Sequence, residues 1–396
     1  MNKRQLIICS AIICALVILS RCISKQPAGG DMRGPQYAAA NSCESCHKAI
    51  YDSYQSTAHA HTSGLANAQT VKGTLTAPAN RFVFGNGTEV VMEQQDGRLY
   101  QAAYSNGALQ QKQAFDIAVG SGRKAQTFLY WQAGKYMQLP ISWFVPANSW
   151  ANSPGFPADH PKFDRAIPST CFGCHSSMVG IKSVSAQGLE MQEEFEQNKL
   201  VAGIDCQRCH GPAADHVNYQ TEHPQEKTAH FMAKIGALNT QQQIDMCAVC
   251  HSGLKPMLKP ASEFKPGDAL ADFVMPTAPF PTSRIDVHGN QLQLLAASKC
   301  FTGSKQMTCS SCHSPHKTER ENMQVFSQRC MSCHMAGSPN FCTLKTVPAA
   351  TLQQNCIDCH MPATPSSAIT LLTNGKQSPT PDSIRTHWIK VYKEVK

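Results

Sequence analysis

The sequence has 396 residues, with 19 cysteines, 16 histidines and a formal net charge of +8. Its length suits two domains and is enough to build a core without disulfide staples, so the cysteines need a chemical explanation. Three basic residues, Lys3, Arg4 and Arg21, lie at the N-terminus and the others are scattered, which excludes the concentrated basic surface of a nucleic-acid-binding protein.

The N-terminus has the pattern of a secretory signal peptide, residues 1–22. Lys3 and Arg4 precede the apolar run 6–20, which is shorter than the roughly 20 residues of a membrane span. Cys22 stands where a lipoprotein carries its acylated cysteine, although Arg21 replaces the small residue expected before it. A soluble protein cleaved nearby and an uncleaved anchor helix are the alternatives. Each predicts an exported protein, either in the periplasm or anchored outside the cytoplasm, with residues 23–42 as a linker.

A CxxCH motif occurs seven times, numbered here motifs 1 to 7 in chain order. In this motif the two thiols form thioethers to a porphyrin, and the histidine ligates its iron as the proximal ligand. Zinc sites give no reason for a histidine after every CxxC pair, and disulfides do not explain its fixed offset. The sequence therefore predicts seven covalently bound haem c groups. The tethers are Cys43, Cys46, Cys171, Cys174, Cys206, Cys209, Cys247, Cys250, Cys309, Cys312, Cys330, Cys333, Cys356 and Cys359, and the proximal ligands are His47, His175, His210, His251, His313, His334 and His360.

The first haem segment, 43–75, is followed by a long gap before motif 2. Within it, apolar residues alternate with polar ones, and Asp-Gly and Asn-Gly pairs signal hairpin turns. We expect residues 76–150 to form a small antiparallel β-rich insertion.

Residues 151–396 are expected to form a hexahaem domain. The segments between its motifs are too short for a full hydrophobic core, so the porphyrins should supply much of the apolar filling. Short helices should carry the proximal ligands, and residues 189–202 are the best amphipathic helix candidate. The predicted fold is mainly α with much irregular loop, organised by haem, apart from the β insertion.

The second axial ligand of each iron decides its function, because a filled position favours electron transfer and an open one admits a substrate. His316 is too near His313 to reach the far face of the same ring, so we expect it to ligate a neighbouring haem, and His216 likewise. The tail should fold back and bring His387 to a haem. Methionine ligation is less economical. Cys300 and Cys342 remain outside the motifs and suggest a disulfide, with two independent thiols as the alternative.

On these motifs the chain resembles the exported multihaem c-type cytochromes of the cytochrome c-554 and c-552/4-like family. The similar stretches are CESCHKAIYDSYQSTAHA, IDCQRCHGPAADH, HGNQL, CSSCHSPH and RTHW. The resemblance implies distal ligands at His59, His216, His288, His316 and His387. Other histidines outside the motifs complete the set of distal candidates: His61, His160 and His230.

The leading functional hypothesis is an electron carrier with closely spaced, mostly bis-histidine haems and no catalytic residue. Its partners would be redox proteins, namely a quinol-side donor and a terminal reductase or external acceptor, with membrane attachment if Cys22 is lipidated. The alternative is an oxidoreductase with one open haem, acting on nitrite, hydroxylamine or a sulfur oxyanion. The CxxCK motif of pentahaem nitrite reductases is absent from the sequence. A structural haem-rich module of a larger complex is the third reading.

Overall fold

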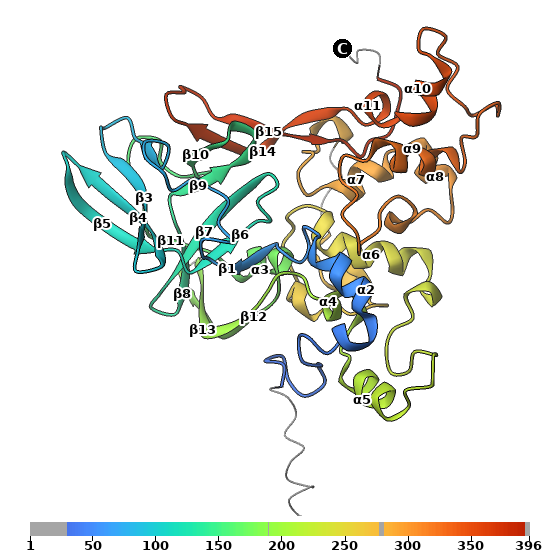
Figure 1. Cartoon of the computed structure of the whole chain (residues 1–396), viewed down its shortest axis with the longest axis horizontal. Helices are drawn as coiled ribbons and strands as arrows, with labels where there is room; N and C mark the ends of the chain where they lie inside the picture. Colours follow the sequence, from blue (N-terminus) through green and yellow to red (C-terminus); the bar gives the residue numbers. More distant parts are fainter. Residues whose placement is uncertain (1–29, 189, 277–280, 393–396) are drawn as a thin grey trace, which may run out of the picture.

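The computed structural model describes residues 30–188, 190–276 and 281–392, so the predicted signal peptide and Cys22 lie outside the described residues. The chain forms two halves that lie side by side (Figure 1). One half consists of strands, most of them from the segment between motifs 1 and 2. The other half consists of short helices joined by irregular loops. It contains α2 (Glu44–Gln55), the first helix among the described residues, together with the C-terminal helices.

The β half is built from antiparallel strands. Its larger sheet has the order β1-β6-β7-β9-β10-β14-β15, with β8 added beside β7 and β11 beside β8. A four-stranded sheet runs β2-β3-β4-β5, and β12 and β13 form a long hairpin. The strands are β1 (Ser63–Leu65), β2 (Arg81–Val83), β3 (Glu89–Gln95), β4 (Arg98–Ser105), β5 (Ala108–Ala114), β6 (Ile117–Val119), β7 (Ala125–Gln132), β8 (Lys135–Gln138), β9 (Ile141–Phe144), β10 (Ser149–Asn152), β11 (Arg165–Ala166), β12 (Ser176–Gln187), β13 (Glu190–Ala202), β14 (Ala363–Thr373) and β15 (Thr380–Arg385).

Turn chemistry fixes the two hairpins of the four-stranded sheet. Asp96 and Gly97 have φ of 50° and 77°, and Asn106 and Gly107 have φ of 49° and 77°. Two consecutive residues with positive φ are what a tight hairpin turn requires, and Asn, Asp and Gly adopt that region at the lowest cost. The flanking strands can therefore alternate buried and exposed residues in a single register.

The strands enclose a hydrophobic core of their own. Its largest cluster gathers aromatic side chains that are almost fully buried, among them Phe82, Phe128 and Trp150. The rings of Phe128 and Phe115 stack at 4.4 Å between centroids, and Trp150 packs against both. Burial of such side chains stabilises the β half by its own contacts.

The helical half is made of short elements. The α-helices after α2 are α3 (Ser169–His175), α4 (Cys206–His210), α5 (Ala214–Glu222), α6 (Thr240–His251), α7 (Gln291–Ala296), α8 (Lys299–Gly303), α9 (Met323–Met331), α10 (Ala349–Gln354) and α11 (Ile357–His360). A small apolar cluster, around Phe264 and Phe273, packs on α6. Between residues 295 and 356, all of which the structure describes, no apolar side chain is buried.

The prediction of a mainly α fold is wrong, because the described residues are 27% strand and 26% helix. Within the candidate helix at 189–202, residues 190–202 instead form strand β13, paired with β12. Phe195 of this strand is buried against Tyr136 and Phe172, at 5.4 and 5.8 Å between ring centroids. Intrinsic helix propensity determines secondary structure only weakly, so the strand pairing and the packing of Phe195 override it here. The C-terminal hairpin β14–β15 also joins the larger sheet, through pairing of β14 with β10.

The expected disulfide is not formed, since Cys300 and Cys342 are both free thiols. Cys300 lies close enough to Cys312 and Cys330 to influence their pKa values, so it sits beside motifs 5 and 6.

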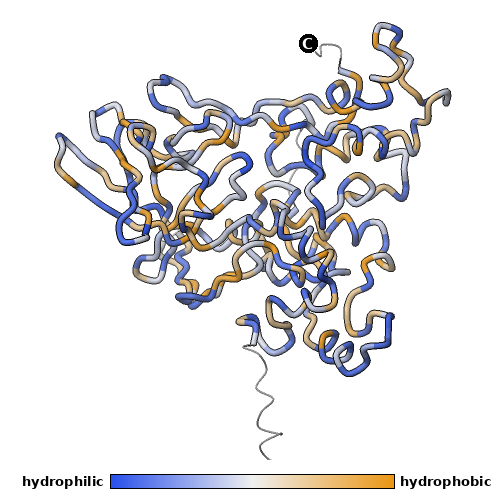
Figure 2. The backbone as a smooth tube through the Cα atoms, in the orientation of Figure 1, coloured by the Kyte–Doolittle hydropathy of each residue, from blue (hydrophilic) through white to orange (hydrophobic). Residues whose placement is uncertain are grey.

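Hydrophobic and hydrophilic residues alternate over short stretches along the whole described chain (Figure 2). Consistent with this, none of the helices among the described residues is both long and apolar enough to cross a membrane.

Candidate haem sites

All seven CxxCH motifs lie on, or directly beside, a helical turn. The turns are α2, α3, α4, α6, the 3-10 turn η6 (Cys309–Ser311), α9 and α11, for motifs 1 to 7 respectively. In four motifs the histidine amide donates to the carbonyl of the first cysteine, at 2.9 to 3.1 Å: His47, His313, His334 and His360. This bond places residues i and i+4 on one face of the turn. The first thiol and the imidazole of these motifs therefore start from the same side of the backbone.

Polar caps fix where several of these turns begin. The Asp205 carboxylate accepts a hydrogen bond from the amide of Arg208 and caps α4 at motif 3. Asn239 and Gln242 form a capping box at the start of α6, and Thr308 and Ser311 form one at η6. Each cap satisfies amides that have no partner within the helix. The sequence signal for these turns is an Asp, Asn or Thr just ahead of a motif or of its helix.

Four proximal histidines face a second histidine from a distant part of the chain. The ring centroids are 6.4 Å apart for His47 and His216, 6.0 Å for His210 and His316, 6.0 Å for His251 and His59, and 6.1 Å for His313 and His387. A metal–imidazole bond is about 2 Å long, and the ring centre lies about 1 Å beyond the nitrogen. Two imidazoles on opposite sides of one iron thus place their centroids roughly 6 Å apart.

His175 of motif 2 makes no ring contact with another histidine in the described part of the chain, but His288 lies near it. Burial lowers the pKa of His175, and the nearby His288 ring lowers it further. His288 also lies near His251, but that ring already faces His59. His288 is therefore the second imidazole available to His175.

The environment of these rings favours neutral imidazole, which is the form that binds iron. Burial lowers the pKa of His59 to about 4 and that of His387 to about 4, with neighbouring histidines adding to the effect. The pKa values of His210, His251 and His313 are also lowered, mainly by burial. Buried nitrogens of His175 and His387 have no hydrogen-bond partner. Neutral, paired imidazoles beside thiol pairs are the donor set that haem c uses, so the residues fit that cofactor.

Several of the candidate ligands have Nδ1 held by a protein oxygen. His216 Nδ1 lies 2.9 Å from the carbonyl of His230, and His360 Nδ1 lies 2.9 Å from that of Lys390. His334 Nδ1 is similarly 2.6 Å from the carbonyl of Asn340. A bond from Nδ1 to a carbonyl leaves Nε2 free for a metal and fixes the orientation of the ring.

Besides His175, two proximal histidines in the described part of the chain make no ring contact with a second imidazole. Among the described residues, which include all 16 histidines, neither His334 nor His360 makes a ring contact with another histidine. The remaining distal candidates lie elsewhere. His61 binds the carbonyl of Gln55, His160 is exposed and pairs with Asp159, and His230 packs against Tyr219.

The thiols of different motifs also meet. Side-chain contacts join motif 1 to motif 3, motif 2 to motif 4, motif 4 to motif 5, and motif 6 to motif 7. The pairs are Cys43–Cys206, Cys174–Cys250, Cys247–Cys309 and Cys330–Cys356. Weaker electrostatic interactions link Cys209 to Cys250, and Cys312 to Cys333. In a haem-loaded chain these sulfurs would be thioethers, so the edges of successive porphyrins would lie close together.

Motif 2 is anchored to the β half by an apolar contact. Phe172, inside the motif, is 2% exposed, and its ring lies 5.1 Å from that of Tyr136. The CxxCH pattern does not specify the two residues between the cysteines. An aromatic residue at one of these positions is therefore the sequence feature that could have indicated this anchor.

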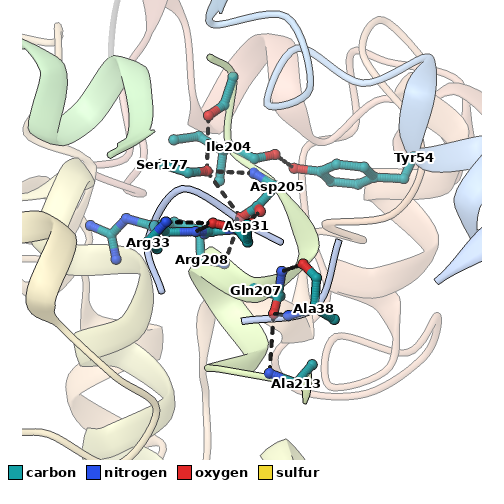
Figure 3. Close-up of polar contacts among 11 residues, drawn as sticks. Asp31, Arg33, Ala38, Tyr54, Ser177, Ile204, Asp205, Gln207, Arg208 and Ala213 are labelled. Carbon is teal, nitrogen blue, oxygen red and sulfur yellow. Dashed lines mark hydrogen bonds and ion pairs between the residues drawn. The ribbon is translucent and has the colours of Figure 1, made fainter. Parts of the chain in front are cut away.

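Motif 3 is anchored by polar contacts instead (Figure 3). The Asp205 carboxylate accepts from Arg33 and from the Ser177 hydroxyl, and Arg33 also bonds Asp31. Tyr54, on α2, donates its hydroxyl to the carbonyl of Ile204. The cluster ties residues 31–33 and the helix that carries motif 1 to motif 3, and the strand after motif 2 joins them through Ser177.

Comparisons with known proteins agree with this chemistry. Residues 42–80 and 157–211 match the family described as cytochrome c554 and c-prime. A multihaem cytochrome MtrA from Shewanella baltica (strain OS185) is 24% identical over 182 residues, 42% of this chain and 52% of that protein. The match thus spans about half the length of that relative. These matches support a multihaem c-type cytochrome with covalently bound haem.

The fold has a counterpart among solved structures. The outer cell wall cytochrome OcwA superposes with a TM-score of 0.53 at 14% identity, covering 90% of this chain and 80% of that one. At this identity the likeness concerns the fold. It extends over both halves of this chain, including the β half that the family match leaves largely uncovered.

Proposed function

We propose that the chain is an exported heptahaem c-type cytochrome that conducts electrons through closely spaced haems. The observation that carries the proposal is the set of four imidazole pairs at 6.0 to 6.4 Å, each joining a proximal histidine to a histidine elsewhere in the chain. Iron with imidazole on both sides has no position for a substrate, so it exchanges electrons without binding one. When bound, haem supplies the one-electron chemistry; the chain supplies tethers, axial ligands and a low-dielectric environment.

Five irons would have two histidine ligands. The assignments are His47 with His216 for motif 1, His175 with His288 for motif 2, His210 with His316 for motif 3, His251 with His59 for motif 4, and His313 with His387 for motif 5. In each pair the second ligand comes from another part of the chain. Every ligation would therefore clamp two segments together and hold neighbouring haems at fixed separation.

The thiol contacts suggest an order for the haems. It runs 1–3–4–5–6–7, and haem 2 branches from haem 4. Haems 1 and 7 would be the two ends, and haem 2 a side branch that lies against the β half through Phe172. Partner proteins would exchange electrons at these three positions: a quinol-side donor, and a terminal reductase or an external acceptor.

A second candidate function follows from motifs 6 and 7. Because His334 and His360 face no second histidine among the described residues, their irons would each keep one position for an external ligand. Such haems would bind a small anion such as nitrite at one end of the chain. The function would then be that of an oxidoreductase supplied with electrons by the five bis-histidine haems.

One experiment separates these outcomes. The exported holoprotein would be purified, its haem-to-protein ratio measured, and ferric EPR spectra recorded with and without cyanide and nitrite. Seven haems with at least five low-spin centres support the electron-conducting proposal, and fewer than five low-spin centres contradict it. A high-spin fraction near two haems in seven that shifts with added ligand supports the second candidate. A wholly low-spin spectrum that ignores the ligands rules the second candidate out.

A further inference from the structure

Arg208 lies between the two cysteines of motif 3, and it is buried without a counter-ion. The residue is 7% exposed, and its terminal nitrogens donate to the carbonyls of Ala261 at 2.5 Å and Phe264 at 3.4 Å. Its Nε is buried and has no hydrogen-bond partner. No carboxylate among the described residues forms an ion pair with it, and the neighbouring Asp205 is held by Arg33 (Figure 3).

The guanidinium lies where three haem motifs meet. Arg208 belongs to motif 3, and Ala261, whose carbonyl it binds, packs against Gly173 of motif 2. The Cys250 thiol of motif 4 lies 3.6 Å from the carbonyl oxygen of the same Gly173. In the proposed order these motifs form the branch point of the haem network. Arg208 is thus a fixed positive charge at the branch point.

A buried guanidinium is stable only when an anion or several hydrogen bonds compensate its charge. Two carbonyls compensate Arg208 in part and leave Nε–H without an acceptor. Each haem c brings two propionate carboxylates, and Arg binds carboxylates through paired, charge-assisted hydrogen bonds. No carboxylate of this chain takes that position in the described structure, whereas the cofactors expected here carry carboxylates.

We propose that Arg208 binds a propionate of one of the haems that meet at motifs 2, 3 and 4, and that it raises the reduction potential of the haems at this branch point. The inference rests on the proposed heptahaem function. A positive charge near the iron favours the ferrous state, which has one positive charge fewer than the ferric state. The branch point would then hold electrons more readily than it would without Arg208.

The test is a redox titration of the holoprotein followed in its haem absorption bands. We expect Arg208→Gln to lower the reduction equilibrium constant of at least one haem about tenfold, which corresponds to about 59 mV for a one-electron couple. Arg208→Lys keeps the charge and should leave the potentials close to those of the unmodified protein. Arg98→Gln, at the exposed start of β4, removes the same charge from the β half and serves as the control.

A purely structural Arg208 predicts a different pattern. In that case the Gln and Lys variants would lose the two carbonyl contacts alike and change haem content or stability without a charge-dependent difference in potential, which would overturn the inference. Unchanged potentials in a fully loaded Gln variant would also overturn it. These outcomes leave the haem count and spin states intact, so they differ from a failure of the proposed function, which would appear as missing low-spin haems.

The Lys variant provides a second test if Arg208→Gln does not assemble. Redox-difference infrared spectra report the carboxylate stretches of haem propionates. Replacing the planar fork of Arg by an ammonium should shift at least one of these bands, because bidentate contact is lost. Identical propionate bands in the unmodified protein and Arg208→Lys would contradict propionate binding.

Discussion

The two halves of the molecule obtain their cohesion from different sources. The β half buries large aromatic side chains such as Phe128 and Trp150 in clusters made of protein alone. In the helical half, the 62 residues from 295 to 356 bury no apolar side chain and make only short helical turns. Such a segment cannot offset the conformational entropy of folding by its own contacts. Apolar haem faces and iron–histidine bonds would supply the stabilising contacts that the side chains of this segment do not provide.

Removing one haem from the helical half should give the largest effect. In the double variant Cys309→Ser, Cys312→Ser, motif 5 cannot form thioethers, and we expect residues 295–356 to lose their amide protection almost completely. Strands β3 and β4 should keep theirs, because their contacts are internal to the β half. Hydrogen exchange followed by mass spectrometry measures both regions in one sample.

Cys300→Ser is the matched control for this variant, because it removes a thiol close to motif 5 that lies outside every CxxCH motif. It should leave exchange in both regions unchanged. If residues 295–356 stayed protected in the double variant, the helical half would be stable without this haem. That result would contradict the proposal that the two halves differ in their source of stability.

The converse variant weakens the β half. Phe128 is fully buried, so Phe128→Ala should cost about 3–5 kcal/mol of unfolding free energy in that half. The haem absorption spectrum should not change, because the cluster around Phe128 contains no residue of a CxxCH motif. Urea titration, with hydrogen exchange of β4 and β7 as the readout, gives the cost.

Leu109→Ala on β5 is the comparison, since Leu109 is 53% exposed and its truncation should change stability by less than about 0.5 kcal/mol. Equal effects of the two substitutions would contradict the existence of a separate protein core in the β half.

His387 connects the two halves. It follows β15 of the larger sheet, and its ring faces His313 of motif 5. We expect His387→Ala to convert one haem in seven from low-spin to high-spin, because no other imidazole faces His313 among the described residues. Ferric EPR measures the conversion, and His160→Ala, at an exposed histidine, should leave the spectrum as it was. An unchanged spectrum for His387→Ala would remove His387 from the ligand set.

The contrast also explains what could be predicted from sequence. CxxCH is a chemical requirement of haem attachment, so the motif can be recognised without knowing the fold. The Asp-Gly and Asn-Gly turns can be predicted because positive φ favours those residues. The strand identity of residues 190–202 was missed because it depends on pairing with β12 and on the packing of Phe195, which are contacts outside that segment. The helical half offered little hydrophobic periodicity because its helices are short and residues 295–356 bury no apolar side chain.

The histidine pairs show the same limit. His216 and His316 were expected to face a neighbouring motif because the chain is too short to reach their own, which is a local argument. Which motif a given distal histidine faces could not be derived from the sequence, because the partners can be far apart along the chain. His59, for example, meets His251 across nearly two hundred residues. Arg208 was missed altogether, since a burial without a counter-ion is a property of three-dimensional structure.

The smallest effect on stability should come from substitutions at Asp205, in the polar anchor of motif 3. Two substitutions there distinguish the contribution of the helix cap from that of the ion pair. Asp205→Ala removes both the cap of α4 and the contacts with Arg33 and Ser177, and should cost about 2 kcal/mol. Asp205→Asn keeps a side-chain oxygen for the cap but loses the charge, and should cost roughly 1 kcal/mol, because Arg33 retains Asp31. Denaturant titration of holoprotein monitored at the haem bands compares the two. If both substitutions cost the same, the cap contributes nothing and the ion pair alone holds motif 3. In a combined Arg33→Met, Asp205→Asn variant, the loss of unfolding free energy should be smaller than the sum of the losses in the two single variants, since the two side chains act as one interaction.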